Sequence, residues 1–87
     1  MYYVYILENK NDFGWYIGYS SNLQRRIADH LAGRGCKTTS KKTGWILIYY
    51  EAYLSKVDAM GREMFLKSGL GRRYIEKQLA NYLSVDK

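Results

Sequence analysis

The chain has 87 residues, of which 47% are hydrophobic and 25% are charged, a composition typical of one globular domain spanning residues 1–87. No apolar run approaches the roughly 18 residues of a membrane span, which excludes a membrane-spanning protein. The single cysteine excludes an internal disulfide. Since no signal peptide is evident either, we expect a cytoplasmic protein. Fourteen Lys and Arg against eight Asp and Glu give a formal charge of +6, which favours a polyanion such as nucleic acid as a partner.

The first segment of the chain predicts a β-hairpin. Residues 2–8, YYVYILE, and residues 15–19, WYIGY, are rich in the aromatic and β-branched side chains that favour strands. The polar stretch NKNDFG between them is short enough to join the two strands antiparallel. Gly18 lies inside the second strand, where a missing side chain loses packing, so we expect a group to approach its backbone closely.

A helix is predicted over residues 23–31, LQRRIADHL, between the capping stretch SSN and Gly33. Leu23, Ile27 and Leu31 recur every four residues and predict an apolar stripe that faces the sheet.

Arg26 and His30 lie at one edge of that stripe, one turn apart, because successive helical residues are rotated by about 100°. Arg25 faces solvent in the same arrangement. Taken alone, Arg26 is interpreted as a side chain whose stem covers the core while its charge reaches water. The alternative is that Arg26 and His30, the only histidine, lie near an anion, since two cations at this spacing otherwise repel.

Residues 33–44, GRGCKTTSKKTG, predict a polar, basic loop that is long for so small a domain. We interpret its cysteine, Cys36, as incidental to any chemistry. Two interpretations of the loop's cations stay open, namely contacts with nucleic-acid phosphates or simple solvation. These cations are Arg34, Lys37, Lys41 and Lys42.

The rest of the chain predicts one strand and two helices. Residues 45–53, WILIYYEAY, form the most hydrophobic segment and are expected at the centre of the sheet. A helix is expected from Ser55 to about Ser68, ended by Gly69, and a last helix over residues 71–83. The fold expected is α/β of the α+β type, a small three-stranded antiparallel sheet flanked by three helices in the order β-β-α-β-α-α. The predicted core-facing residues of these two helices are Val57, Met60, Met64 and Phe65, and then Ile75, Leu79 and Leu83.

Glu63 and Lys67 lie at the edge of the apolar face of the second predicted helix. Glu before Lys at this spacing is the favourable order for an ion pair, which contributes a few tenths of a kcal/mol. The alternative is a carboxylate at the rim of a site, where it holds a divalent metal ion.

Three segments, VYIL, WYIGYSSNLQRRIADH and GREMFLK, together resemble the GIY-YIG nuclease domain. The form is the small stand-alone bacterial one, similar to the N-terminal nuclease domain of the excision-repair nuclease C subunit. The resemblance covers residues 2 to about 83. The first half-motif departs from the family pattern, because Tyr3 stands at its glycine position, and Asn81 is the one candidate for an asparagine that many members carry after the glutamate.

The resemblance implies a catalytic site made of Tyr5, Tyr16, Arg26, His30 and Glu63. In this site Glu63 binds one Mg²⁺ or Mn²⁺ and Arg26 holds phosphate oxygens. Tyr5 orients or deprotonates the attacking water, while Tyr16 and His30 complete the same cluster. The residues expected to contact nucleic acid are Gly18, Arg34, Lys37, Lys41, Lys42 and Lys67.

The function implied is that of a metal-dependent DNA endonuclease, directed by DNA structure or low in sequence specificity, with a role in repair or recombination. The alternative is a non-catalytic nucleic-acid-binding module with the same fold. A protein-interaction domain that uses exposed tyrosines is a third and more distant hypothesis. Because one metal site makes one nick, a homodimer or a larger repair complex is also expected among the partners.

Overall fold

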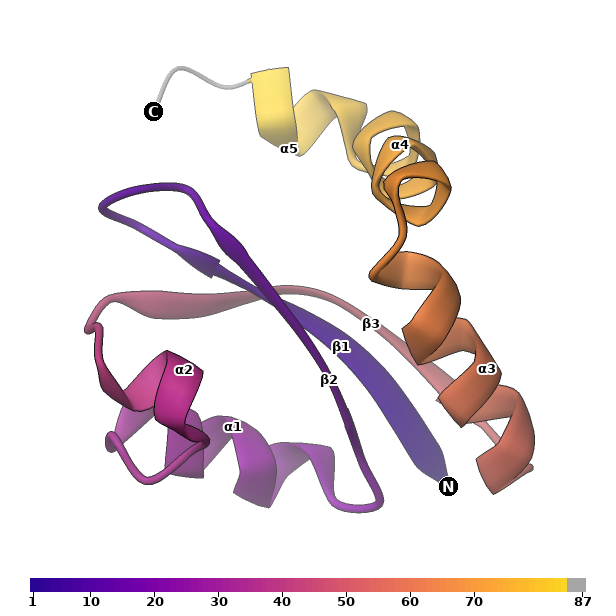
Figure 1. The fold of residues 1–87 in the computed structure, drawn as a ribbon, viewed down its shortest axis with the longest axis horizontal. Coiled ribbons are helices and arrows are strands. Elements are labelled where there is room, and N and C mark those ends of the chain that lie inside the picture. The colour runs from indigo at the N-terminus through magenta and orange to yellow at the C-terminus, as the bar shows by residue number, and fades with distance from the viewer. Residues whose placement is uncertain (85–87) are drawn as a thin grey trace.

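The computed structural model describes residues 1–84, and its framework is a three-stranded antiparallel sheet with helices against both faces (Figure 1). The elements in chain order are β1 (Tyr2–Asn9), β2 (Trp15–Ser20), α1 (Leu23–Leu31), α2 (Lys37–Ser40), β3 (Trp45–Tyr53), α3 (Lys56–Leu66), α4 (Gly69–Gln78) and α5 (Ala80–Ser84). The predicted α+β class and element order are confirmed, and two short helices, α2 and α5, add to the expected ones. Within residues 1–84, no helix is long and apolar enough to cross a membrane.

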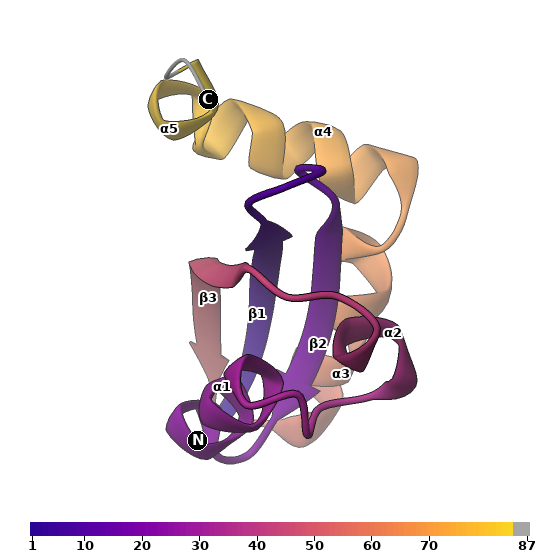
Figure 2. The ribbon, with the colours of Figure 1, turned by 90° about the vertical axis from the view of Figure 1, so that its left-hand side faces the viewer.

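The central strand is β1, because the order across the sheet is β2-β1-β3 (Figure 2). The expectation that residues 45–53 lie at the centre is therefore wrong. Helices cover β1 on both faces, so residues 4–9 are all buried, whereas β3 leaves Leu47 37% and Tyr50 54% exposed. Apolar composition shows that a strand packs against neighbours, and an edge strand with large side chains meets that description as well as a central one.

The sheet separates two hydrophobic clusters, as the alternation of side chains along β1 requires. The first cluster lies between the sheet, α3 and α4 and contains Val4, Ile6, Ala59, Leu66 and Ile75. The second lies on the face covered by α1 and contains Tyr5, Leu7 and Trp45, with Tyr16, Leu23 and Ile27 packed against it. The second cluster positions the candidate site, because it contains both tyrosines that the sequence singles out.

The helix α1 has the predicted bounds, and Gly33, with φ at 78°, follows its end in the left-handed region that glycine favours. Its last turn buries a different residue from the one expected. His30 is 2% exposed, whereas Leu31, predicted to continue the apolar stripe, is 63% exposed. A polar side chain is accommodated here because Tyr5 and Thr39 provide hydrogen-bond partners for both of its ring nitrogens.

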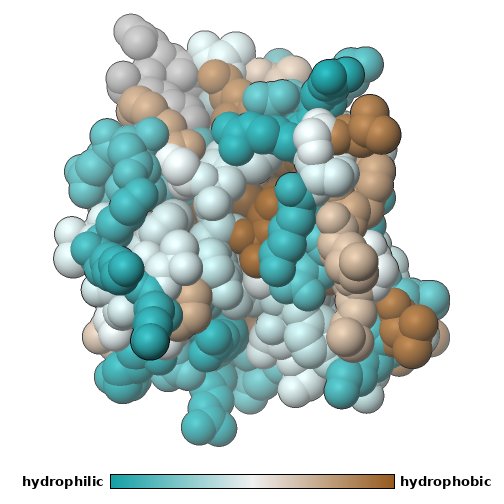
Figure 3. Space-filling view, viewed as in Figure 1, coloured by the Kyte–Doolittle hydropathy of each residue, from teal (hydrophilic) through white to brown (hydrophobic). Residues whose placement is uncertain are grey.

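The helix α3 turns a different face to the sheet from the one its apolar residues predict. Ala59 and Leu66 are buried, while hydrophobic side chains reach the surface on the outer, right-hand side of the molecule, where α3 lies (Figure 3). The predicted core residues of this helix are exposed instead, Val57 by 77%, Met60 by 47%, Met64 by 74% and Phe65 by 37%.

An ion pair between α3 and β3 explains this rotation. Arg62 donates from Nε to Glu51 Oε1 and from an Nη atom to Oε2, both at 2.9 Å. Glu51 also accepts from the hydroxyls of Tyr49 and Tyr53. Arg62 lies between Ala59 and Leu66 on the helix surface, so pairing its charge with a carboxylate on the sheet turns that face inward.

The C-terminal helical region is divided at two points. Ser68 caps α4 by accepting from the backbone N–H of Gly71 at 3.1 Å, so Gly69 begins α4 instead of ending the preceding helix. The single helix predicted over residues 71–83 is interrupted at Leu79, which separates α4 from α5. Within the predicted loop at residues 33–44, α2 forms one helical turn.

Candidate active site

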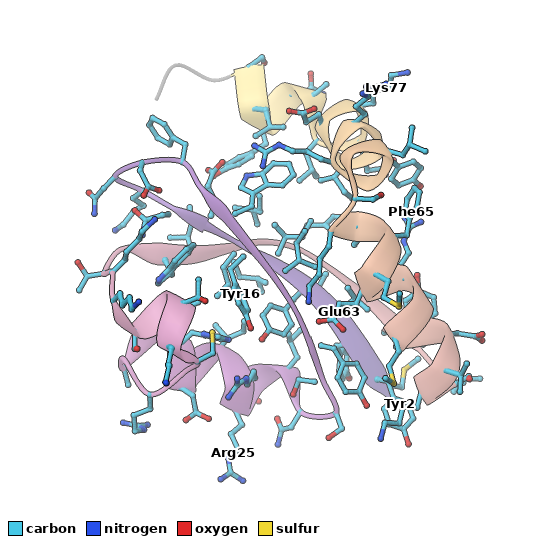
Figure 4. The ribbon with its side chains drawn as sticks, viewed as in Figure 1. Tyr2, Tyr16, Arg25, Glu63, Phe65 and Lys77 are labelled. Carbon is cyan, nitrogen blue, oxygen red and sulfur yellow. The ribbon has the colours of Figure 1, made fainter. Side chains whose placement is uncertain are left out.

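Four elements bring the predicted site residues together beside the β2 edge of the sheet. Tyr5 belongs to β1, Tyr16 to β2, Arg26 and His30 to α1, and Glu63 to α3. The edge strand β2 lies nearest the viewer in Figure 1. Glu63 points from α3 toward the middle of the molecule, where Tyr16 lies (Figure 4).

The centre of this cluster is a buried hydrogen bond between Tyr5 and His30. The Tyr5 hydroxyl lies 2.9 Å from His30 Nε2, and the two residues are only 1% and 2% exposed. The Arg26 guanidinium lies close enough to the same phenol to lower its pKa, against the larger effect of burial, which raises it. The ring of Tyr16 completes the cluster, with its centroid 6.4 Å from that of Tyr5 and 5.2 Å from that of His30.

Gly18 allows Tyr5 to occupy this position. The two residues are paired directly across β1 and β2, and a Cβ atom at position 18 would lie 2.4 Å from both Cζ and the hydroxyl oxygen of Tyr5. The close neighbour expected at Gly18 is therefore the Tyr5 phenol. Gly18 is itself buried, so this geometry lends no support to its predicted contact with nucleic acid.

Thr39, on α2, fixes the protonation pattern of His30. Its Oγ1 lies 2.8 Å from His30 Nδ1 and donates its own hydrogen to the carbonyl of Cys36 at 3.4 Å. We assign the Thr39 hydrogen to that carbonyl, so that Nδ1 donates to Thr39 and Nε2 accepts from the Tyr5 O–H. Burial, together with the charge of Arg26, lowers the pKa of His30, so the ring is neutral at pH 7.

The sequence patterns give no indication of two contributors to the cluster, Thr39 and Cys36. Thr39 is fully buried, and its carbonyl accepts from Trp45 Nε1 at 3.0 Å. Burial alone would raise the pKa of Cys36, but hydrogen bonds with Tyr16 and Thr39 lower it to about 7. The interpretation of Cys36 as incidental is therefore incomplete. A single helical turn is too short to produce a periodic pattern that could have revealed either residue.

The two phenols differ in their access to solvent, although both are protonated at neutral pH. Burial raises the pKa of Tyr5, while its hydrogen bond with Arg26 and the charge of Arg26 oppose this shift. Burial also raises the pKa of Tyr16, and a hydrogen bond with Cys36 adds to the increase. Tyr16 is half-buried and borders a groove at the edge of β2, whereas Tyr5 is sealed inside the protein. Tyr16 is thus the phenol within reach of a bound substrate.

Glu63 forms the ion pair with Lys67 that their spacing predicts, with 3.1 Å between Oε2 and Nζ. Within residues 1–84, no group of three or more His, Cys, Asp or Glu side chains is placed to hold a metal ion. Glu63 therefore acts as a single carboxylate. This donor set fits Mg²⁺ or Mn²⁺, which bind proteins through one or two carboxylates and complete their shells with waters and substrate phosphates. Lys67 contacts only Oε2, which leaves Oε1 of the same carboxylate for an ion.

The other residues predicted to contact nucleic acid have varied surroundings. Arg34 and Lys42 each pair with an aspartate, at 3.6 Å and 2.6 Å. Lys37 and Lys41 are exposed. Asn81 belongs to α5, at the opposite end of the molecule from α1 (Figure 1), so it lies apart from the cluster.

Comparison with known proteins supports a family assignment for this arrangement. A family profile described as the GIY-YIG catalytic domain matches residues 1–77. A UPF0213 protein of Staphylococcus haemolyticus is 43% identical over 67 residues, which make up 77% of this chain and 80% of that protein. A UPF0213 protein of Natronomonas pharaonis is 40% identical over 80 residues, 92% of each chain. The solution NMR structure of a UPF0213 protein from Bacillus halodurans aligns with a TM-score of 0.56 and 41% identity, covering 92% of this chain and 84% of that one.

Proposed function

Because the chain belongs to the GIY-YIG catalytic domain family, a nuclease family, we propose that it is a metal-dependent DNA endonuclease. The observation that supports this proposal most strongly is the convergence of Tyr5, Tyr16, Arg26 and His30 in one cluster, built on the Tyr5–His30 hydrogen bond, with Glu63 near it. A neutral base, an arginine and two phenols at an edge of the sheet match the needs of phosphodiester hydrolysis, namely a positioned water and charge relief on the phosphate.

In the proposed reaction Arg26 binds non-bridging phosphate oxygens through the N–H groups that it does not use on Tyr5, since its planar fork suits phosphate. Tyr16 orients the attacking water as a neutral phenol, because Tyr16 borders the groove while Tyr5 is buried. This assignment moves the role expected of Tyr5 to its neighbour. Tyr5 and His30 then form the buried wall against which Tyr16 packs, and their mutual hydrogen bond holds that wall in place.

Glu63 is proposed to hold one Mg²⁺ or Mn²⁺, which would supply charge stabilisation for the phosphate and the leaving 3′-oxygen. Lys67, which pairs with one oxygen of Glu63, would contact the phosphate backbone beside the ion. We further propose low sequence specificity, directed by DNA structure, in repair or recombination, and assembly as a homodimer or in a larger complex where both strands are cut.

The alternative function, a non-catalytic nucleic-acid-binding module, retains the fold and the positive charge but needs no metal carboxylate. The retention of Tyr16, Arg26 and Glu63 together supports the enzyme, because a module that only binds has no need of a carboxylate among its cations.

Incubation of the protein with supercoiled plasmid and branched DNA, in Mg²⁺, Mn²⁺ or EDTA, tests the proposal. We expect nicking only with metal and its loss in Glu63→Gln, which keeps the size of the side chain but weakens it as a metal ligand. Asp58→Asn, an exposed acid-to-amide change on the same helix, is the matched control and should cleave like the wild type. Binding without cleavage by the wild type under all conditions would favour the binding module.

A further inference from the structure

A groove beside Tyr16 continues outward from the candidate site along the edge of β2. It encloses about 390 Å³ and lies between α2 on one side and the junction of α3 and α4 on the other. Figure 3 looks onto this edge and shows a recess near the centre with hydrophobic atoms at its floor and polar side chains around it. The residues used below, called the β2-edge groove, are Trp15, Tyr16, Thr38, Lys67, Ser68 and Arg72.

Two cations and two hydroxyl groups form the polar part of the β2-edge groove. Lys67 connects it to the site, because its ammonium group lies 3.1 Å from the Glu63 carboxylate. Arg72 lies one turn into α4 and Thr38 carries an exposed hydroxyl, whereas the Ser68 hydroxyl is used within the fold, where it donates to the Phe65 carbonyl and accepts from the Gly71 N–H. Lys, Arg, Ser and Thr are the residue types that contact sugar-phosphate backbones without reading bases. None of the side chains that line this groove is acidic.

Arg72 is held in place by the aromatic floor of the groove. Its guanidinium carbon lies 4.2 Å from the centroid of the Trp15 ring, a stacked cation–π contact. Trp15 is fixed in turn, because its Nε1 donates to Glu8 at 3.1 Å, and Glu8 also accepts from the Tyr82 hydroxyl at 2.7 Å. The partner on α4, Glu76, lies 3.6 Å away and the pair is half-exposed, so this ion pair is weak and exchangeable.

We propose that the β2-edge groove binds the sugar-phosphate backbone of the DNA strand on one side of the scissile phosphate, with Arg72 as its outer phosphate contact and Lys67 as its inner one. This inference rests on the proposed function, because it requires a nucleic-acid substrate at Tyr16. It deepens that function by assigning Arg72, Trp15 and Thr38, which neither the sequence patterns nor the family motif singles out, to the path of the strand.

A binding assay that needs no cleavage tests this path. Fluorescence anisotropy of labelled single-stranded and double-stranded oligonucleotides is measured in EDTA over a series of salt concentrations. We expect Arg72→Ala to weaken binding about tenfold at low salt and to reduce the slope of log K against log salt by about 0.7–0.9. Arg72→Lys, which keeps the charge, should retain most of the affinity.

The matched control is Arg73→Ala, which removes the same charge from the next residue. Arg73 lines a different surface, beside Phe65 and Tyr74, so this variant should bind like the wild type. Equal weakening by the Arg72 and Arg73 substitutions would mean a general effect of charge and would contradict the proposal that DNA binds in the β2-edge groove. If the wild type binds no DNA at any salt concentration, both this inference and the proposed function are wrong. If the wild type cleaves DNA but Arg72→Ala binds DNA as tightly as the wild type, only this inference is wrong.

The two tryptophans provide a second readout, measured on the wild-type protein. Each indole N–H gives one signal in a ¹H–¹⁵N spectrum, and Trp15 lies in the groove while Trp45 is 5% exposed. Titration with oligonucleotide should shift the Trp15 signal more than that of Trp45, with the assignment made from Trp15→Phe. A Trp15 signal that does not shift at a saturating concentration of oligonucleotide would contradict binding in the β2-edge groove.

Discussion

The hydroxyl of Tyr5 and the Nε2 atom of His30 lie 2.9 Å apart in the interior of the protein, and both residues are almost fully buried. His30 is thereby joined to the sheet through one phenol, and through Nδ1 to Thr39 on α2. We assign the direction of these hydrogen bonds from the contact of Thr39 Oγ1 with the Cys36 carbonyl, to which Thr39 donates while it accepts from the ring. In this assignment the Tyr5 hydroxyl is the donor and His30 Nε2 is the acceptor.

The first prediction concerns the tautomer of His30. The wild type should show a protonated Nδ1 and an unprotonated Nε2 in long-range ¹H–¹⁵N spectra at pH 7, because Nδ1 donates to Thr39. Thr39→Val removes the acceptor and should shift the ring toward the Nε2–H form. The spectrum is unambiguous, since His30 is the only histidine. Thr39→Ser keeps the hydroxyl and should keep the wild-type tautomer, and an Nε2–H form in the wild type would contradict the assignment.

The second prediction is a loss of stability in mild acid that depends on His30. Burial and the charge of Arg26 lower the pKa of His30 in the folded state, so below the unfolded pKa of about 6.5 the unfolded chain binds more protons. The free energy of unfolding should therefore fall as pH drops below about 6.5, by at most about 1.4 kcal/mol per pH unit, until the folded pKa is passed. Urea unfolding between pH 7.5 and 5 measures this slope. The His30→Gln variant has no titrating group at this position, so its free energy of unfolding should depend less on pH in this window. An equal pH dependence in the variant and the wild type would show that His30 is not its cause.

The third prediction concerns Gly18. Gly18→Ala places a methyl group 2.4 Å from the Tyr5 phenol, so the ring has to move away from His30. We expect a loss of about 1–3 kcal/mol in the free energy of unfolding, as for other overpacked cores, together with reduced cleavage. The control is Gly61→Ala, where the added methyl meets nothing within 4 Å on the exposed side of α3. That variant should gain about 0.5–1 kcal/mol, because alanine favours a helix interior over glycine.

The fourth prediction compares two adjacent arginines on α1. Arg26→Ala should reduce the cleavage rate about 10²–10³-fold, as the loss of one group that stabilises transition-state charge does. Arg25 is exposed and points away from the cluster (Figure 4), so Arg25→Ala should cleave almost like the wild type. Both variants lose one positive charge. Cleavage rates measured with saturating plasmid report the effect on the reaction itself, because a change in DNA affinity does not alter the rate at saturation. Equal losses would show that Arg26 acts only through its charge.

The fifth prediction concerns the ion pair between Glu51 and Arg62. Glu51→Gln leaves Arg62 without its counter-charge and should lower the free energy of unfolding by about 3 kcal/mol, the lower end for broken buried pairs, since the Arg62 side chain keeps 23% exposure. In a double-mutant cycle with Arg62→Met, the coupling energy should be about 1–3 kcal/mol. Urea unfolding of the four proteins measures it, and a coupling near zero would remove the pair as the cause of the rotation of α3.

Local patterns were sufficient for most of the elements and for the orientation of several candidate site residues. Residues 23–31 and 45–53 have the predicted bounds because capping residues, glycines and side-chain periodicity act within a few positions of each other. The helical wheel separated Arg26 from Arg25 correctly, since neighbouring residues of a regular helix must point in different directions. It also placed Glu63 within one turn of Lys67, and their ion pair forms.

Which side of α3 faces the sheet was decided by the tertiary structure. The exposed Val57, Met60 and Met64 form the more apolar stripe, yet the helix turns inward the face with Ala59 and Leu66. The reason is Glu51, which lies on β3 and offers Arg62 a two-point hydrogen bond. A pattern within one helix contains no information about a carboxylate on a strand that packs against it.

The sequence by itself determined the strands, the main helices and the residue types of a family nuclease site, because these depend on short-range propensity and on a recognisable motif. The tertiary structure decided that β1 is central, that Tyr5 is sealed while Tyr16 meets the groove, and that Thr39 orients His30. Burial and hydrogen-bond direction depend on which segments pack together, and packing joins residues that are distant in the sequence.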